Sequence, residues 1–322
     1  MSSERRAPAA GRVQISPELD RARLDAAVRD AFGLSWSAAR EAVRTGKVFR
    51  GDPGVVALDE AAKVRKGDFL ELRPAAPRPH VAKRAGFERG AIVHLDASVV
   101  VVEKPAGVST VPFAGEEDPR ETLDAWVREA LTKKTGARGR APLGVVHRID
   151  KETSGLVVFA RSVAAKKHLS NQFRLHTTER RYLAIVNGAF TTKRTFRSHL
   201  VEDRGDGIRG SAPPHRREGQ LAVTHAEPVR ALVGATLVSC TLETGRTHQI
   251  RIHLSEAGNP LVGEKVYVRG YSGPKIDAPR LMLHAAMLGF VHPATEELMR
   301  FESDPPADFA AVLARLERPS SG

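Results

Sequence analysis

The chain has a single cysteine, Cys240, among its 322 residues, and it has no apolar run of about 20 residues that could span a membrane. One cysteine cannot form an intramolecular disulfide, so a disulfide-stabilised secreted fold is excluded. The arginine-bearing start of the chain also lacks the apolar segment of a signal peptide. We therefore expect a cytoplasmic protein that does not enter a membrane, with Cys240 as a buried thiol.

Acidic and aromatic residues are both scarce. The sequence has 38 Asp and Glu residues against 50 Lys and Arg residues, which gives a formal net charge of +12. Such an excess of positive charge is typical of proteins that bind a polyanion such as RNA. Aromatic residues make up 5% of the chain, so a long row of bases stacked on aromatic rings is not expected. A pocket that takes a few bases suits this composition better.

Residues 147–155, His-Arg-Ile-Asp-Lys-Glu-Thr-Ser-Gly, place one carboxylate between two apolar runs. The runs 143–146 and 156–160 are short and rich in Val, so each predicts a buried strand. Asp150 is therefore expected on a loop that is held from both sides. A carboxylate in that position can be a nucleophile, a base, a metal ligand or a helix cap. No Cys, Asp or His repeats around Asp150 at the spacing of metal ligands, so no metal site is predicted.

The same string resembles the signature of the RluA/RluD-type RNA pseudouridine synthases, which is His-Arg-Leu-Asp, two variable residues and then Thr-Ser-Gly. Ile149 in place of Leu is the only departure. Four further blocks occur in the order of that family, at 101–107, 181–184, 244–251 and 280–285. Because five blocks follow one another across about two-thirds of the chain, the resemblance is highly specific.

The resemblance implies a fold and a reaction. The fold would be α+β, with a catalytic domain built on a mixed, mostly antiparallel sheet flanked by helices and loops. The reaction would break the bond from the uracil nitrogen to the sugar, turn the base over and rejoin it through a ring carbon, without a cofactor or a metal. Asp150 would be the nucleophile that attacks either the sugar or the ring, as carboxylates do at other sugar centres.

Arg251 and Tyr182 would complete the catalytic set by the same resemblance. Asp150 must be ionised in a site largely removed from water, so it needs a nearby cation, which Arg251 would supply from a helix that Thr247 caps. Tyr182, in a predicted strand, would stack on the target base and help to remove a proton. From the residues alone, a surface arginine on an amphipathic helix is the favoured interpretation of Arg251, and a buried tyrosine such as Tyr182 is normally a packing residue.

Further residues are expected to contact the substrate. Leu283 and Leu281 would line the apolar side of the uracil pocket, although core leucines have the same sequence pattern. Arg148 would enter the gap left when the target uridine swings out of its stack. The other expected RNA contacts are His147, Arg181, Lys166 and Lys167, of which the two lysines lie on the outer side of a predicted helix at 162–176, and Arg40 and Lys47 in the N-terminal part of the chain.

A second, small α+β domain is predicted before the catalytic domain. Residues 15–73 resemble the S4-like RNA-binding module, with two helices followed by a hairpin, although Trp36 stands where that module commonly has Arg. The predicted boundaries are a disordered tail at 1–14, the S4-like domain at 15–73, a linker at 74–90, the catalytic domain at 91–318 and a tail at 319–322.

The sequence leaves several functions open. The favoured one is isomerisation of uridines in large-subunit ribosomal RNA, with transfer RNA as the alternative substrate. A non-catalytic RNA-binding factor of ribosome assembly is the second possibility. A base-excising hydrolase is the third, and it would need another group to activate water, for which Glu152 is the nearest candidate. RNA is the only expected partner, and the protein is expected to be a monomer.

Overall fold

The computed structural model describes residues 10–51, 55–57, 62–76, 91–112, 121–135, 141–205, 207–213 and 218–317. The chain divides into two compact units, residues 1–86 and 87–322, and the division falls within the predicted linker. Most of that linker, the first nine residues and the tail at 319–322 lie outside the described residues. Within the described ranges, no helix is long and apolar enough to cross a membrane.

The N-terminal unit has two helices and a four-stranded antiparallel sheet. Its elements are β1 (Gly11–Gln14), α1 (Leu24–Phe32), α2 (Trp36–Arg44), β2 (Val48–Arg50), β3 (Val55–Val56) and β4 (Phe69–Leu72), with the strand order β1-β4-β2-β3. The helices bury Leu24, Val28 and Val43 in one core with residues of β2 and β4. The prediction of a tail at 1–14 is wrong for Gly11–Gln14, because this segment pairs with β4. A mostly exposed edge strand carries too few apolar residues to be distinguished from a tail in the sequence.

The larger unit is built on one sheet of 11 strands, with the path β11-β10-β12-β13-β9-β14-β8-β6-β5, to which β15 adds at β14 and β7 at β8. The pairing of β8 with β14 is parallel and the other pairings are antiparallel, which confirms the predicted mixed, mostly antiparallel sheet. The strands are β5 (Ile92–Leu95), β6 (Val99–Lys104), β7 (Gly144–Val145), β8 (Ser154–Ala160), β9 (Glu179–Asn187), β10 (Arg194–Val201), β11 (Gly210–Ser211), β12 (Gln220–Leu232), β13 (Ala235–Leu242), β14 (Leu283–Val291) and β15 (Leu298–Glu302).

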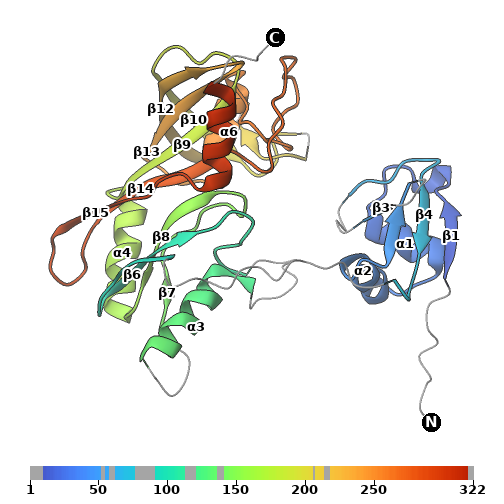
Figure 1. Ribbon diagram of the computed structural model, residues 1–322, viewed down its shortest axis with the longest axis horizontal. Helices are drawn as coiled ribbons and strands as arrows, with labels where there is room; N and C mark the ends of the chain where they lie inside the picture. The colour runs from blue at the N-terminus through green and yellow to red at the C-terminus, as the bar shows by residue number, and fades with distance from the viewer. Residues whose placement is uncertain are drawn as a thin grey trace. The chain divides into compact units, whose positions relative to one another are not determined.

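Four helices flank this sheet (Figure 1): α3 (Leu123–Thr135), α4 (Val163–Leu175), α5 (Gln249–Glu256) and α6 (Ala307–Glu317). Alternate residues of β8 pack into two different hydrophobic cores, one on each face of the sheet. Val157 and Phe159 pack with α3 and α5, whereas Leu156 and Val158 pack with α4. Helix α6 packs against the part of the sheet that contains Ile185. The helix predicted at 162–176 is confirmed as α4, and Cys240 is a buried thiol in β13 as expected.

The contact between β8 and β14 depends on a glycine of the motif at 147–155. Only Ser154 and Gly155 of β8 pair with β14, opposite His284 and Ala285. Gly155 has a φ of +115°, and a Cβ at this position would lie 2.3 Å from the carbonyl oxygen of Ala285. Because only glycine allows both the dihedral angle and the approach, it fixes the start of β8, directly after the loop that carries Asp150.

Candidate active site

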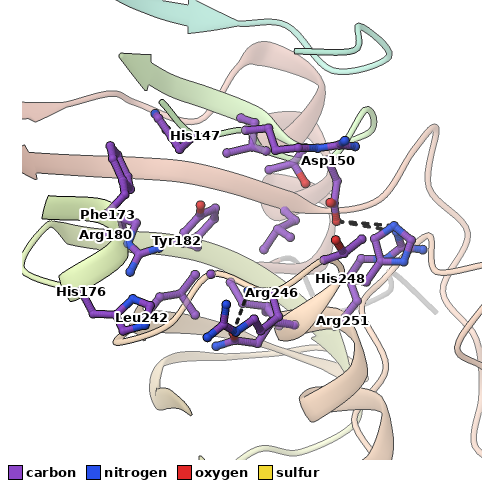
Figure 2. A pocket seen from close by; sticks show the side chains of 18 of the residues that line it. His147, Asp150, Phe173, His176, Arg180, Tyr182, Leu242, Arg246, His248 and Arg251 are labelled. Atoms are coloured by element: carbon purple, nitrogen blue, oxygen red, sulfur yellow. Dashed lines mark hydrogen bonds and ion pairs between the residues drawn. The ribbon is translucent and has the colours of Figure 1, made fainter. Parts of the chain in front are cut away.

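A cavity with a volume of about 400 Å³ lies beside Asp150 (Figure 2). Its walls come from the loop between β7 and β8, the C-terminal end of α4, strand β9, the segment that connects β13 to α5, the first turn of α5, and the first residue of β14. Five arginines are among the described residues that line it, and Asp150 is the only carboxylate among them. The cavity therefore combines one anionic group with a strongly positive wall.

The backbone of the Asp150 loop is held on both sides of the carboxylate. The Thr110 hydroxyl donates to the carbonyl of Ile149 at 3.0 Å, and the N–H of Ile149 donates back at 3.3 Å. On the other side, the buried ammonium of Lys104 donates to the carbonyls of Lys151, Pro105 and Val108 at 2.8 to 3.0 Å. Burial lowers the pKa of Lys104 to about 7. The loop is therefore fixed by bonds that leave the Asp150 side chain free to face the cavity.

Arg251 is the cation beside Asp150, as predicted. Its Nη1 lies 3.8 Å from Oδ2 of Asp150, and its Nε and Nη2 donate to the two carboxylate oxygens of Glu264 at 2.8 Å each. Burial opposes the charge on Arg251, but the hydrogen bonds and charge of Glu264 outweigh it and raise the pKa of Arg251. The Glu264 carboxylate also accepts the backbone N–H of Val266 and Tyr267. Glu264 therefore holds the guanidinium edge formed by Nε and Nη2, and Nη1 is left toward Asp150.

His248 is a second neighbour of Asp150. Its Nε2 lies 4.0 Å from Oδ2 of Asp150, and its Nδ1 is 2.7 Å from the hydroxyl of Tyr267. Burial is the main cause that lowers the pKa of His248. The prediction that Thr247 caps α5 is wrong, because His248 occupies the N-cap position with a left-handed φ of 59° and makes no side-chain cap bond. This backbone conformation is uncommon for a residue other than glycine, and it directs the imidazole toward the cavity (Figure 2).

Tyr182 and Leu283 supply the aromatic and apolar surface. Tyr182 projects from β9 into the cavity (Figure 2), and burial raises its pKa to about 12, so its hydroxyl keeps the proton at neutral pH. Leu283 lines the same cavity from β14. Leu281 is buried in the adjacent core and does not line the cavity. The space between Tyr182 and Leu283 suits a flat, partly apolar ring.

Comparison with known proteins identifies the family of the chain that forms this cavity. Residues 98–256 match a family described as RNA pseudouridylate synthase. A relative from Zymomonas mobilis, named ribosomal large subunit pseudouridine synthase D, is 33% identical over 310 residues, which cover 94% of this chain and 96% of the relative. The chain belongs to the RNA pseudouridine synthase family. It is an isomerase, because these enzymes rearrange uridine in place.

Two further comparisons agree with this family. A relative from Bacillus subtilis, named uncharacterized RNA pseudouridine synthase YlyB, is 37% identical over 230 residues, which cover 70% of this chain and 73% of the relative. The solved structure of human RNA pseudouridylate synthase domain containing 4 has a TM-score of 0.58 at 24% identity, covering 70% of this chain and 93% of that one. The structural likeness shows that the larger unit has the pseudouridine synthase fold.

The two expected RNA-binding residues of the motif, Arg148 and His147, both line the cavity but differ in exposure and in bonding. Arg148 is exposed and lines the cavity. His147 also lines it, but its ring stacks on Phe173 at 4.3 Å between centroids, and its Nε2 accepts the N–H of Val158 at 3.1 Å. Burial lowers the pKa of His147 to about 3. A neutral ring with one nitrogen already bonded supplies no charge for a phosphate, so His147 is better described as part of the cavity wall than as a charged RNA contact.

The other expected contacts lie away from Asp150. Arg181 does not line the cavity and pairs with Glu302 at 2.7 Å, whereas Arg180, one residue earlier on β9, does line it. Lys166 and Lys167 are exposed on α4, as predicted, and Lys167 lines a separate hollow. In the N-terminal unit, Arg40 donates to Asp25 at 3.3 Å, and Lys47 donates to the carbonyl of Ala76.

Several groups at the site were missed in the sequence, and Arg180 and Glu264 show why. Arg180 could have been identified, because residues two apart on a strand face the same side and Tyr182 was already placed in the pocket. Glu264 gives no such signal, since it lies in a connection outside any helix or strand. Within the described ranges, no three His, Cys, Asp or Glu side chains form a group that could hold a metal ion.

Proposed function

We propose that this synthase converts specific uridines of large-subunit ribosomal RNA to pseudouridine, with Asp150 as the nucleophile. The observation that carries the proposal is the Asp150 carboxylate, 3.8 Å from the guanidinium of Arg251 in a cavity with no other carboxylate among its described lining residues. The choice of RNA rests on relatives from Zymomonas mobilis, Nitrosomonas europaea and Pseudomonas aeruginosa, each named ribosomal large subunit pseudouridine synthase D.

The reaction needs a nucleotide that has left its stack. In our proposal, Arg148 fills the gap that the target uridine leaves, which offsets an unstacking cost of a few kcal/mol. The uracil then lies between Tyr182 and Leu283, with its sugar toward Asp150. These positions place the reacting atoms beside the carboxylate and the base on an aromatic surface.

The chemistry follows from the carboxylate. Asp150 attacks either the sugar carbon or the uracil ring, and the bond between N1 and the sugar breaks with its electron pair on the base. The base turns over, C5 bonds to the sugar carbon, Asp150 leaves, and the proton on C5 is lost while N1 regains one. Atoms and charge balance without an oxidant or an added group. Because the Tyr182 hydroxyl keeps its proton, its proposed role is a relay, in which it accepts the C5 proton while it passes its own proton to water.

The smaller unit completes the proposal. We assign it as an S4-like RNA-binding domain, in which Arg40 and Lys47 are basic groups near the RNA. Its two helices and antiparallel sheet with a separate core support an appended binding module. We further propose that the synthase acts as a monomer, and a ribosomal substrate implies that it acts in the cytoplasm.

Mapping pseudouridine in total RNA from cells with and without the protein tests the proposal. We expect one or a few sites in large-subunit ribosomal RNA to lose the modification when the protein is absent, and to regain it with the wild-type gene but not with Asp150→Asn. Loss of sites in transfer RNA alone would replace the ribosomal substrate with the alternative one. Unchanged RNA in every class would refute the catalytic proposal and favour an assembly factor.

The hydrolase alternative makes a separate prediction, which is free uracil in the reaction supernatant. It requires a group that activates water. Glu152, the candidate from the sequence, is exposed and is not among the residues that line the cavity. We therefore favour the isomerase, for which the reaction releases no base.

A further inference from the structure

A cluster of basic side chains lies in the cavity away from Asp150. It consists of Arg180, Arg246 and His176, and we call it the basic cluster. In Figure 2, Tyr182 lies between Asp150 and Arg180. Arg246 is half-buried and His176 is exposed, so a ligand can reach the cluster from solvent. The catalytic roles assigned to Asp150, Arg251 and Tyr182 do not use it.

Arg180 is the buried member of the basic cluster, with 7% of its surface exposed. Its Nη2 donates to the backbone carbonyl of Glu243 at 2.8 Å, but its Nε has no hydrogen-bond partner among the described residues. Burial lowers the pKa of Arg180, Tyr182 opposes this effect, and the nearby charge of Arg246 lowers the pKa further. A buried guanidinium with an unused donor is costly unless an anion is bound.

No carboxylate in the described part of the chain pairs with Arg180. The Glu243 side chain faces His225 instead, with 2.7 Å between its Oε1 and Nε2 of His225. Asp150, the carboxylate of the cavity, lies beside Arg251. The positive charge of Arg180 is therefore not matched by a charge from the protein, which is unusual for a buried ion.

The surroundings of Arg180 keep the space around it open. A Cβ at Gly245 would lie 2.5 Å from Nη1 of Arg180, so a larger residue at position 245 would force the guanidinium to move. Arg246 is held through its Nε, which donates to the carbonyl of Leu221 at 3.0 Å. Its terminal nitrogens make no bond to a described residue and remain available for a ligand.

We propose that the basic cluster binds a phosphodiester of the substrate RNA, at a linkage next to the target uridine. This inference rests on the proposed function, because it takes the ligand of the cavity to be RNA. The backbone phosphate is the anion that RNA brings, and the planar fork of a guanidinium matches its oxygens. A phosphate there would use the free Nε of Arg180 and screen the repulsion between Arg180 and Arg246. With the base on Tyr182 and the sugar at Asp150, the cluster would hold the backbone on the far side of the base.

The test combines a protein variant with a neutral phosphate analogue. The probe is a synthetic stem-loop that contains the uridine modified by the wild-type protein, with natural linkages or with one methylphosphonate on the 5′ or the 3′ side of that uridine. Single-turnover reactions at increasing concentrations of the full-length protein give the half-saturating concentration and the maximal rate. For the wild type, we expect one of the two methylphosphonates to raise the half-saturating concentration about tenfold or more, about 1.4 kcal/mol.

Arg180→Gln should raise the same constant by a similar factor with natural RNA, and the critical methylphosphonate should then add less than a further twofold. The matched control is Arg181→Gln, which removes a neighbouring arginine of the same strand that pairs with Glu302 outside the cavity. This control should respond to the methylphosphonate as the wild type does. If Arg180→Gln does not fold, Arg246→Gln is read in the same way.

Other outcomes overturn the inference. If each methylphosphonate raises the half-saturating concentration of Arg180→Gln by the same factor as that of the wild type, Arg180 contacts neither phosphate. A lower maximal rate with an unchanged half-saturating concentration would assign Arg180 to the support of Tyr182 instead. A wild-type protein that forms no pseudouridine in any RNA would refute the proposed function. If the wild type forms pseudouridine in the stem-loop but the effects of Arg180→Gln and of the methylphosphonate on the half-saturating concentration multiply, only the phosphate site is refuted.

Discussion

At the scale of single residues, the site depends on how charge is shared between Asp150, Arg251 and Glu264. Two carboxylates contact one guanidinium, but they use it differently. Glu264 takes two hydrogen bonds of 2.8 Å, while Asp150 lies 3.8 Å away. The guanidinium is thus held in place by hydrogen bonds to Glu264, and it makes only a longer charge contact with Asp150. A nucleophile held in this way has no tight ion pair to break before attack.

Replacing Glu264 tests this division of roles. Glu264→Gln removes the charge that anchors Arg251, and breaking a buried pair on one side costs about 3 kcal/mol of stability. We expect the maximal rate to fall at least tenfold with little change in RNA affinity, because Arg251 loses its fixed position beside Asp150. The control is Glu302→Gln, since Glu302 pairs with Arg181 outside the cavity. A normal rate in a folded Glu264→Gln variant would show that Arg251 needs no anchor.

Lys104 should make the stability of the protein depend on pH. Its pKa is about 7 in the folded protein and 10.5 without the effects of burial. Between these values the unfolded chain binds a proton that the folded one has lost, so the free energy of unfolding should rise as the pH rises from about 7 toward 10.5. Urea unfolding at pH 6.5 and 9.5 measures this rise. Lys104→Met should lack the Lys104 contribution, and an identical pH dependence in both proteins would contradict the assignment.

At the scale of secondary-structure elements, the motif at 147–155 acts through the strand that follows it. The short parallel contact of β8 with β14 sets the start of β8, and the position of the Asp150 loop depends on that start. The Ser154 hydroxyl also contacts Nδ1 of His284 at 3.0 Å across this contact. The serine and glycine of the motif are therefore part of the framework that positions the carboxylate.

Gly155→Ala tests the framework. The new Cβ would meet the Ala285 carbonyl at 2.3 Å with the backbone at a φ of +115°. Steric overlap and backbone strain together should lower the free energy of unfolding by roughly 3 kcal/mol. Gly258→Ala is the matched control, because Gly258 has a φ of +85° with no atom within 4 Å of the added Cβ, and it should cost only about 1 kcal/mol. Equal losses in chemical denaturation would refute the role of the β8–β14 contact.

The same scale explains what the sequence could and could not predict. The strands around Asp150 and the helices α4 and α5 were predictable, because each has an apolar pattern of the right period. The alternation of side chains along a strand also predicts that Arg180 faces the same side of β9 as Tyr182. The family motif instead led to the choice of Arg181. The left-handed His248 was not predictable, since its conformation depends on tertiary contacts such as the one with Tyr267. The pairing of Glu264 with Arg251 was hidden for the same reason.

At the scale of the whole molecule, each unit has its own hydrophobic core. The described residues that line the cavity beside Asp150 belong to the larger unit. We therefore expect residues 87–322 to fold and to retain the chemical step, while the smaller unit adds affinity for RNA. Such an arrangement would separate catalysis from part of the binding.

Removal of residues 1–86 tests that separation. The shortened protein should keep its maximal rate within a few-fold at saturating concentration, but it should bind RNA more weakly. Each phosphate contact that is lost should flatten the slope of log affinity against log salt concentration by ~0.7 to 0.9. An unchanged affinity and salt slope would show that the smaller unit does not bind RNA.

The central claim is that Asp150 performs the covalent step, and release of tritium from RNA labelled at uracil C5 tests it, because the C5 hydrogen is lost only after that step has occurred. Wild-type protein should release tritium from the target uridine as C5 bonds to the sugar. Asp150→Asn should release none above background while it still binds the same RNA within a few-fold of the wild type. Tritium release by Asp150→Asn at a rate comparable to the wild type would contradict the account.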